Sequence, residues 1–165
     1  MSGTADAFAA PPGTQWQRVS PKLRAMRRAL VTIVVIVCAG ALAAGLSPTG
    51  PVGPIVVVVV GLLAVAWAWV VIDRNWRSWG YTERQDDLLV VHGALFRTLV
   101  VVPYGRMQLV DLEAGPIERL YGIVTVKLHT ASASTDARIR GLSPEDAQHL
   151  RERLASRGEA HAAGL

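Results

Sequence analysis

The chain has 165 residues, of which 51% are hydrophobic and 18% are charged, and its mean hydropathy is +0.31. This composition is too apolar for an ordinary soluble domain of that length and indicates membrane-spanning segments. The net charge of +4 is carried entirely by residues 1–72, so it does not mark the later, neutral part as a nucleic-acid-binding domain. A single cysteine, Cys38, excludes a disulfide within the chain and a thiolate–metal cluster.

The N-terminal half contains two long apolar runs. Residues 1–20 are rich in Ala, Gly and Pro, so we expect a disordered tail there. Residues 29–46 carry no charge and would span about 27 Å as a helix, close to the thickness of a hydrocarbon core. Residues 55–72 form a second charge-free run, and the prolines and glycines of residues 47–54 favour a tight turn between the two. The sequence therefore predicts a two-helix transmembrane hairpin within residues 21–78.

The basic residues around these runs predict the topology. Lysines and arginines flank the outer end of each run, and the turn between the runs has none. The positive-inside rule then places both termini in the cytoplasm, in a multi-pass arrangement. The first run also has features of a signal peptide, because basic residues precede it and Ala41 and Ala43 lie near its end. That alternative stays open, but Arg74 and Arg77 would hold residues 73–165 inside in either case.

Four tryptophans surround the end of the second run: Trp67, Trp69, Trp76 and Trp79. Tryptophan suits a membrane–water interface, because its ring is apolar and its indole N–H needs a polar partner. An aromatic cluster in a soluble core is the alternative, and the apolar runs upstream favour the interface. We expect Trp76 and Trp79 to fix the tilt of the following domain on the membrane.

Residues 79–158 have the pattern of a mainly β domain. Alternation of apolar and polar residues predicts strands at residues 88–92, 94–102, 107–113, 122–129 and 137–141. Short turns with glycine or proline join them, which is typical of an antiparallel sandwich or barrel.

A helix is predicted to follow the last strand. Ser143 is expected as its N-cap, Pro144 as its first residue and Gly158 as its end. The helix has one apolar stripe, formed by Ala147, Leu150 and Leu154. Such a helix must pack on something, and the sheet is the candidate. Residues 159–165 are expected to be a flexible C-terminus.

The sequence shows no pattern of catalytic or metal-binding residues. The four histidines lack metal-ligand spacing, and no H-E-x-x-H, C-x-x-C or glycine-rich phosphate loop is present. Asp86 and Asp87 precede a predicted strand and are interpreted as turn formers. We therefore expect no enzyme, no cofactor and no metal site.

Two segments carry a family resemblance. Residues 102–110, VPYGRMQLV, resemble the P-x-x-R-[IM]-Q-x-V segment of the bacterial pleckstrin-homology proteins, the YdbS-like or membrane-flanked family. Residues 119–123, RLYGI, are similar to that family's R-x-x-G-[ILV] segment, which precedes a valine-alternating strand. Thr130-Ala131 and Gly141-Leu142 follow in the same order, and the resemblance covers residues 22–157.

The resemblance implies a pleckstrin-homology-like fold in a bacterial membrane protein. It implies a curved sheet of about seven strands, plugged at one end by the C-terminal helix. The family has no established catalytic residues, so the matching residues are interpreted structurally. Gly122 is expected at a backbone turn or close approach. Arg106 and Arg119 are expected to hold the region of the third and fourth predicted strands through hydrogen bonds at a buried edge, with phosphate binding as the alternative.

The function expected from these features is that of a membrane-anchored, non-enzymatic interaction module. It would bind protein partners, other membrane proteins or a second copy of itself, at the cytoplasmic face of a bacterial inner membrane, and no nucleic acid. The expected surfaces are the open sheet edge and the loops around residues 114–116 and 131–136. The candidate lipid or partner contacts are Arg74, Trp76, Arg77, Trp79, Arg106 and Arg119.

Two alternatives remain for this module. It could recognise anionic lipid headgroups through Arg74, Arg77, Arg106 and Arg119, although the neutral domain lacks a surplus of basic residues. It could also be an accessory subunit of a transporter or envelope assembly, with the helices making the contacts.

Overall fold

The computed structural model describes residues 15–130 and 136–162. In chain order its elements are α2 (Pro21–Leu46), η1 (Ser47–Thr49), α3 (Val52–Arg77), β1 (Gly80–Glu83), β2 (Asp87–His92), β3 (Thr98–Pro103), η2 (Tyr104–Arg106), β4 (Met107–Glu113), α4 (Pro116–Leu120), β5 (Val124–Thr130), β6 (Ala137–Leu142) and α5 (Pro144–Ala162). The chain divides into two compact units. The hairpin unit is Arg24–Arg74, and the β unit comprises Met1–Leu23 and Asn75–Leu165.

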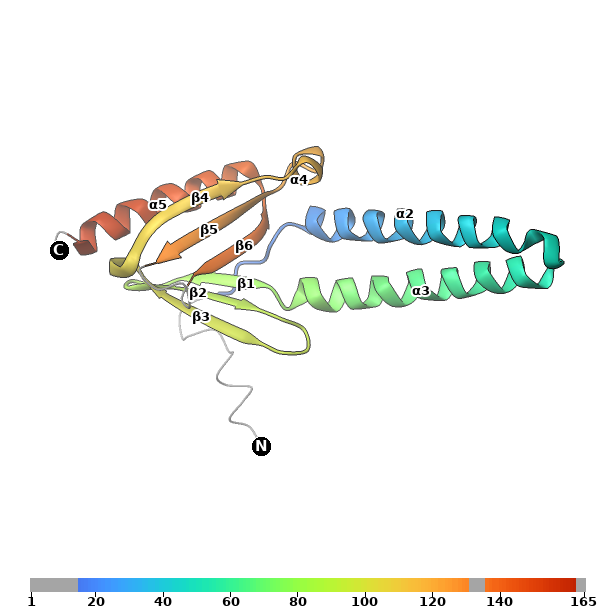
Figure 1. Ribbon diagram of the computed structural model, residues 1–165. Helices are drawn as coiled ribbons and strands as arrows, with labels where there is room; N and C mark the ends of the chain where they lie inside the picture. Colours follow the sequence, from blue (N-terminus) through green and yellow to red (C-terminus); the bar gives the residue numbers. More distant parts are fainter. Residues whose placement is uncertain (1–14, 131–135, 163–165) are drawn as a thin grey trace, which may run out of the picture. The chain divides into compact units, whose positions relative to one another are not determined.

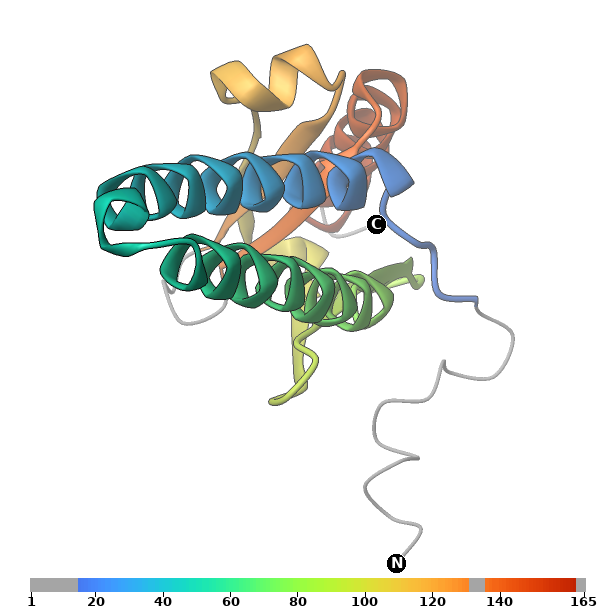
Figure 2. The ribbon, with the colours of Figure 1, turned by 90° about the vertical axis from the view of Figure 1, so that its right-hand side faces the viewer.

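The hairpin unit consists of two helices that lie side by side, as predicted (Figures 1 and 2). Both α2 and α3 are long and apolar enough to cross a membrane, and their most apolar windows are 0% buried. The helices approach closely at Gly61, where an added Cβ would lie 3.4 Å from the Ala39 Cβ. Gly40 and Gly45 have open space around them, so these two glycines of α2 do not take part in the packing of α2 against α3.

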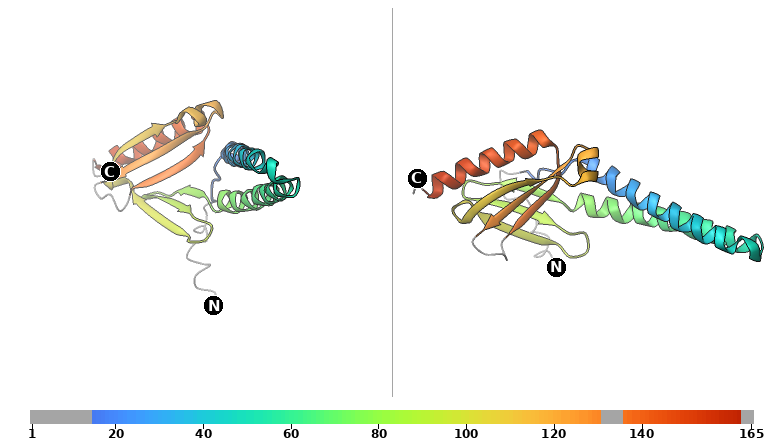
Figure 3. Two further views of the ribbon diagram at one scale, coloured as in Figure 1. Left: turned by 45° about the vertical axis from the view of Figure 1, so that its right-hand side comes forward. Right: turned by 45° about the horizontal axis from the view of Figure 1, so that its top comes forward.

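The β unit contains two three-stranded antiparallel sheets, ordered β1-β2-β3 and β4-β5-β6. In the first sheet, β2 pairs with β3 from Asp87 opposite Pro103 to His92 opposite Thr98. The two sheets approach each other where β2 meets β6, and α5 lies along β4, β5 and η2 (Figure 3). This arrangement confirms a mainly β sandwich with a C-terminal helix.

The core of the β unit lies between the sheets and α5. Its largest buried side chains come from every layer: Tyr104, Leu23, Leu88, Ile123, Leu128, Ile139, Leu150 and Leu154. The predicted stripe of α5 is confirmed, because Ala147, Leu150 and Leu154 are all 0% exposed. Ser143 is the N-cap as predicted, and its Oγ accepts a hydrogen bond from the Asp146 N–H at 3.1 Å.

The prediction of a disordered tail is wrong for residues 15–20; residues 1–14 lie outside the described part. Gln17 pairs with Tyr81 through hydrogen bonds of 2.8 and 3.1 Å between their backbones. The Ser20 N–H donates to the Gly141 carbonyl at 2.8 Å, and the Val19 side chain is 2% exposed. Composition alone suggested disorder, but these backbone groups find partners on two strands that are distant in sequence.

The strand predicted at residues 94–102 starts later than expected. Residues 94–97 form a turn, and β3 begins at Thr98. Gly93 has φ +103°, and a Cβ there would lie 1.8 Å from the Phe96 carbonyl oxygen, so only glycine allows this turn. The apolar pair Leu95-Phe96 imitated a strand pattern although both side chains are exposed.

Two helices and the number of strands also differ from the sequence prediction. Helix α4 (Pro116–Leu120) follows the expected loop around residues 114–116 and was not predicted, and α5 continues through Gly158 to Ala162. The described residues form six strands in two sheets, where the resemblance implied about seven in one curved sheet.

The expectation for Gly122 is confirmed, since its φ of +59° makes the turn between α4 and β5.

Candidate functional site

The junction between α3 and β1 contains two of the candidate tryptophans. The Trp76 indole N–H donates to the Ser20 carbonyl at 3.2 Å, which links the N-terminal segment to the end of α3. The Trp79 ring stacks on His92 of β2, with 5.2 Å between ring centroids. The Trp79 Nε1 is buried and has no hydrogen-bond partner in the described part of the chain. Both rings therefore hold the junction together.

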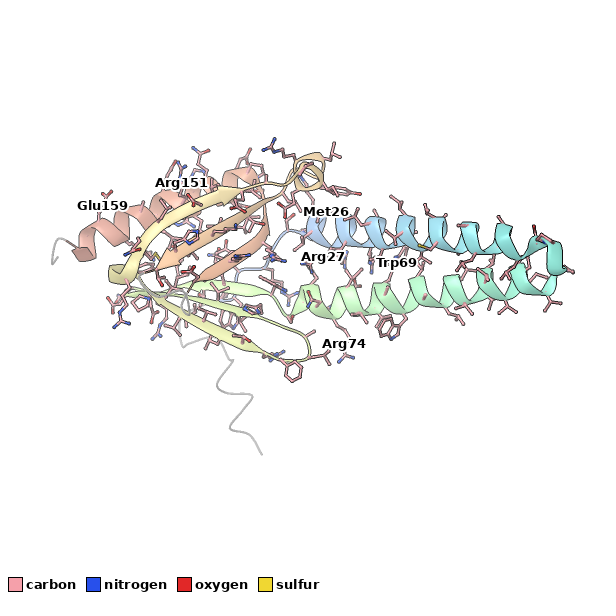
Figure 4. All side chains as sticks on the ribbon, in the orientation of Figure 1. Met26, Arg27, Trp69, Arg74, Arg151 and Glu159 are labelled. Carbon is pink, nitrogen blue, oxygen red and sulfur yellow. The ribbon has the colours of Figure 1, made fainter. Side chains whose placement is uncertain are left out.

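The four candidate arginines do not form one site. Arg106 and Arg119 are exposed at opposite ends of β4, which is seven residues and therefore about 23 Å long. Arg119 donates through Nε to the Ala114 carbonyl at 3.0 Å, an exposed contact within the connection between β4 and α4. Arg77 is exposed and lines a small groove of about 150 Å³ with Arg97. Arg74 is exposed and belongs to the hairpin unit (Figure 4).

A cleft with basic residues lies where β2 and β6 meet. Its volume is about 310 Å³, and its lining includes Trp79, His92, Arg138 and Arg140. Arg138 and Arg140 are exposed and alternate along β6 with buried residues. Asp136 also lines the cleft, but its carboxylate accepts the Thr130 N–H at 2.9 Å. The sequence analysis missed this cleft. The alternation in ARIRG indicates one basic face of β6, but not which strand lies opposite it.

The outer edge of β3 is open in the described part of the chain. This strand pairs with β2 only, and it carries no charged side chain. Val101 is 41% exposed and Leu99 is half-buried, so the outward face is apolar. Free backbone N–H and C=O groups along such an edge can pair with another extended chain.

A second groove runs between β4 and α5. It has a volume of about 390 Å³, and its lining includes Leu109, Arg151 and Glu159 (Figure 4). The Leu109 side chain is 53% exposed at the edge strand. The arginine and the glutamate give this groove no net preference for an anion or a cation.

The end of the β unit that carries the β1–β2 turn is closed by polar contacts. Glu83 accepts hydrogen bonds from Arg153, the shortest at 2.8 Å, and Arg157 lies 3.4 Å from the same carboxylate. Arg157 also donates to the Tyr104 hydroxyl at 2.8 Å, and Tyr104 donates to the Arg84 carbonyl at 3.1 Å. Burial raises the pKa of Tyr104, and the hydrogen bond from Arg157 opposes that shift.

The base of the hairpin unit contains an ion-pair cluster. Arg28 lies 2.7 Å from the Asp73 carboxylate, and Arg24 lies 3.9 Å from it. The Arg28 guanidinium also stacks over the Trp69 ring at 4.9 Å, and the Trp69 indole N–H donates to Thr32 at 3.1 Å (Figure 4). The acidic residue that ends the second apolar run therefore joins the two helices at their charged ends.

The described residues contain no group of three or more His, Cys, Asp or Glu side chains that could hold a metal ion. His129 lies between two carboxylates, at 3.8 Å from Asp111 and 3.4 Å from Asp136, with more than a third of each side chain exposed.

Comparison with known proteins gives one family and one curated relative. Residues 28–158 match a family model described as a bacterial PH domain. The chain is 33% identical over 79 residues to the UPF0699 transmembrane protein YdbS of Bacillus subtilis (strain 168). That alignment covers 48% of this chain and 48% of the relative, so the chain matches about half of the relative's length. No solved structure matches the chain.

Proposed function

The chain belongs to the bacterial PH domain family, and on that premise we propose that it is a non-enzymatic module that binds protein partners at the cytoplasmic face of a bacterial membrane. Two apolar helices and a transmembrane relative support a membrane-associated PH-like module. The basic residues that flank both helices, against none in the turn, support the cytoplasmic placement.

The open edge of β3 is the observation that carries this proposal. An extended segment of a partner can add to the first sheet beside β3 and satisfy its outward backbone groups. The outward side chains Leu99 and Val101 would then contact alternate apolar residues of the partner. The partner is therefore expected to contribute an extended, largely apolar segment.

Attachment to the membrane strengthens such an interaction without any new contact. A module confined near the bilayer meets other membrane-bound proteins at a high effective concentration. A modest edge-strand interaction can therefore be specific for partners in the same membrane, and it would be weak for the same segment in solution.

Site-specific crosslinking of the full chain in bacterial membranes tests the β3 proposal. A photoreactive residue is placed at Leu99, and the adducts are compared with and without the second substitution Val101→Lys. A lysine on an edge strand opposes pairing with a further strand. We expect adducts from position 99, and we expect Val101→Lys to remove most of them.

The matched control is Gln148→Lys, because Gln148 is exposed on α5, away from β3. This control should leave the adducts from position 99 unchanged. The β3 proposal would be overturned if the adducts also survived Val101→Lys. It would also be overturned if adducts formed only when the photoreactive residue was placed on α3 instead of at position 99. The second outcome would assign the contacts to the helices, as in an accessory subunit.

Recognition of an anionic group is a second candidate function, and the cleft between β2 and β6 favours it. Arg138 and Arg140 are exposed on β6 and give that cleft donors suited to a phosphate. The four arginines expected from the sequence do not converge and do not support it. The test is calorimetric titration of the full chain with a short-chain phosphatidylglycerol. Loss of binding in Arg138→Gln/Arg140→Gln is expected, and no binding by the unmodified chain would remove this candidate.

A further inference from the structure

Three large hydrophobic side chains stand out in the described part of the β unit because of their exposure. Leu95 is 94% exposed, Phe96 is 87% exposed and Leu120 is 85% exposed. The first two form the tip of the β2–β3 turn, and the third ends α4. Leaving such residues in water is unfavourable, and grouped exposed apolar residues mark an interaction site.

The β2–β3 turn lies at the end of the β unit where α3 leads into β1. Gly80 pairs with Val91, and Trp79 stacks on His92, so the base of the turn is level with the start of β1. Arg97 of the turn lines the same small groove as Arg77. The positive φ of Gly93 and the stacking of Trp79 on His92 fix the base of this turn. The apolar tip of the turn extends beyond these two residues.

Helix α4 lies at this same end of the β unit, as Figure 1 shows. A Cβ added at Gly122, just after α4, would lie 3.6 Å from the Lys22 Nζ. Residues 20–23 in turn contact Gly141 through the Ser20 N–H and the Leu23 side chain, and Trp76 donates to the Ser20 carbonyl. The two apolar tips therefore flank the place where the chain enters and leaves the β unit.

The length of the connecting chain brings this end close to a bilayer. The second apolar run ends at residue 72 and β1 begins at residue 80, and the first run begins at residue 29. The helical part of the second connection, residues 73–77, extends about 8 Å, and two further residues lead into β1. This length is comparable to the depth of a lipid headgroup region. The two connections join the β unit at one end, so that end is confined near the lipid surface.

The charges at this end suit an anionic lipid surface. Its exposed basic side chains include Arg18, Lys22, Arg77, Arg97 and Arg119. Glu118 is occupied, because it accepts the Gly115 N–H at 3.0 Å and the Thr125 hydroxyl at 3.3 Å. Glu145 and Asp146 begin α5 here, and the Ser143 N-cap bonds Asp146. Apolar tips flanked by arginine are typical of segments that lie in a membrane interface.

We propose that the β2–β3 turn and α4 form a two-point lipid contact, with Leu95, Phe96 and Leu120 inserted into the interface of the bilayer that the hairpin crosses. Arg97 and Arg119 then lie at the level of the lipid phosphates. This contact would fix the orientation of the β unit on the bilayer surface. It uses residues that the proposed protein-binding edge does not use, so the two proposals stand or fall separately.

Depth-dependent fluorescence quenching on the full chain tests this proposal. The native cysteine is removed by Cys38→Ala, and single cysteines are introduced as Phe96→Cys or Leu120→Cys and labelled with an environment-sensitive dye. Each protein is reconstituted at one chain per lipid nanodisc, in discs of phosphatidylcholine with or without phosphatidylglycerol, and with spin-labelled lipids as quenchers. A single purified chain per disc excludes a protein partner or a second copy as the cause of quenching.

The control label is Gln85→Cys, on the exposed β1–β2 turn at the far end of the first sheet from the β2–β3 turn. We expect several-fold stronger quenching at positions 96 and 120 than at position 85. Quenching in both lipid compositions supports insertion driven by the apolar tips, and quenching confined to discs with phosphatidylglycerol supports the same contact with arginine as a required part. Quenching at positions 96 and 120 no stronger than at position 85, in both compositions, overturns the proposal.

Substituting the tips while the label stays elsewhere gives an independent readout. In the double variant Leu95→Ser/Phe96→Ser, a label at position 120 should lose quenching, because two contacts hold the orientation better than one. The matched control is Leu109→Ser on β4, an exposed leucine at neither tip, and it should leave quenching at position 120 unchanged. Equal effects of the two substitutions would contradict a contact specific to the tips.

Discussion

Valine is abundant in both units of this chain, but only one unit buries it. In the β unit, Val90, Val102 and Val126 are at most 1% exposed. In the hairpin unit, Val56, Val58 and Val59 of α3 are 49 to 53% exposed, and the apolar windows of both helices are 0% buried. The two helices bury only a narrow face against each other. The described part of the chain therefore leaves most of their apolar side chains exposed.

This difference shows what each unit requires from its surroundings. The β unit makes its own apolar interior, and the hairpin unit needs a lipid bilayer to supply one. Substitutions that remove apolar atoms should therefore destabilise the two units very differently. Matched pairs of substitutions, one in each unit, can test that expectation directly.

The largest difference is expected for leucine truncation. Leu154→Ala removes a 0% exposed side chain from the interior of the β unit and should lower its free energy of unfolding by about 3 kcal/mol. Leu62→Ala removes a 66% exposed side chain from α3, where lipid fills the vacated space, and should have no measurable effect. The measurement is hydrogen exchange of the β5 amides in the full chain in nanodiscs. Similar losses of protection in both variants would contradict the comparison.

A smaller difference is expected for glycine-to-alanine substitutions. Gly141 has φ +77°, and a Cβ there would lie 2.7 Å from the Leu23 Cβ. Gly141→Ala should therefore destabilise the β unit by about 2 kcal/mol, from backbone strain and overpacking together. Gly40 lies within α2 with nothing within 4 Å, so Gly40→Ala should be neutral or slightly stabilising.

Thermal unfolding of these two variants in the same nanodiscs gives the comparison. A lower midpoint is expected for Gly141→Ala only. A midpoint for Gly141→Ala equal to that of the unmodified chain would mean that the segment around Leu23 moves without cost. In that case residues 15–23 would not be a fixed part of the β unit.

The hairpin and the β unit also differed in how well the sequence predicted them. Both helices follow from local features alone, namely two charge-free runs and a proline-rich turn. The start of α5 follows from Ser143, Pro144 and its apolar stripe for the same reason. These signals are contained within one element, so they need no knowledge of what the element contacts.

The features that the sequence did not reveal depend on distant partners. The pairing of Gln17 with Tyr81 and the contact of Leu23 with Gly141 turned a polar segment into part of the β unit. The separation of the strands into two sheets depends on which edges stay unpaired. The apolar pair Leu95-Phe96 was interpreted as strand, and only the fold shows that both side chains are exposed.

Sequence position suggested where some candidate residues lie, but it did not reveal the distant residues that they contact. Trp76 and Trp79 do lie at the junction between helix and sheet, as their position in the sequence suggested. Their partners, Ser20 and His92, are distant in sequence and could not be inferred. The arginines were grouped by residue type, but β4 separates Arg106 from Arg119. Spacing along the chain does not show which end of a strand a side chain occupies.

A third pair of substitutions tests whether the two units are energetically independent. Glu83→Gln weakens the contacts with Arg153 and Arg157 at the closed end of the β unit and should cost about 1 kcal/mol. Asp73→Asn weakens the contact with Arg28 in the hairpin and should leave the β unit unchanged. Exchange rates of the β1 amides distinguish the two variants. Equal loss of protection at β1 would show that the units are coupled.

The smallest effect is expected from the titration of Tyr104, and it should appear only at alkaline pH. Burial raises the pKa of Tyr104 above its ordinary value of about 10, so the folded chain keeps this proton at a pH where the unfolded chain releases it. The resulting stabilisation is complete below about pH 10, and it is lost as the pH rises through the folded-state pKa. Tyr104→Phe removes this titration and also the hydrogen bonds with Arg157 and Arg84, so it should lower stability by a constant amount below pH 10.

Pulse proteolysis in urea, on the full chain in micelles, measures the free energy of unfolding across this range. Above about pH 10, the unmodified chain should lose stability more steeply than Tyr104→Phe. Burial also raises the pKa of Tyr81, which remains in both proteins and therefore cancels in the comparison. Parallel pH profiles would contradict a buried, titrating Tyr104. The hairpin unit contains no tyrosine, so any alkaline loss seen in the protease resistance of α2 and α3 must have another origin.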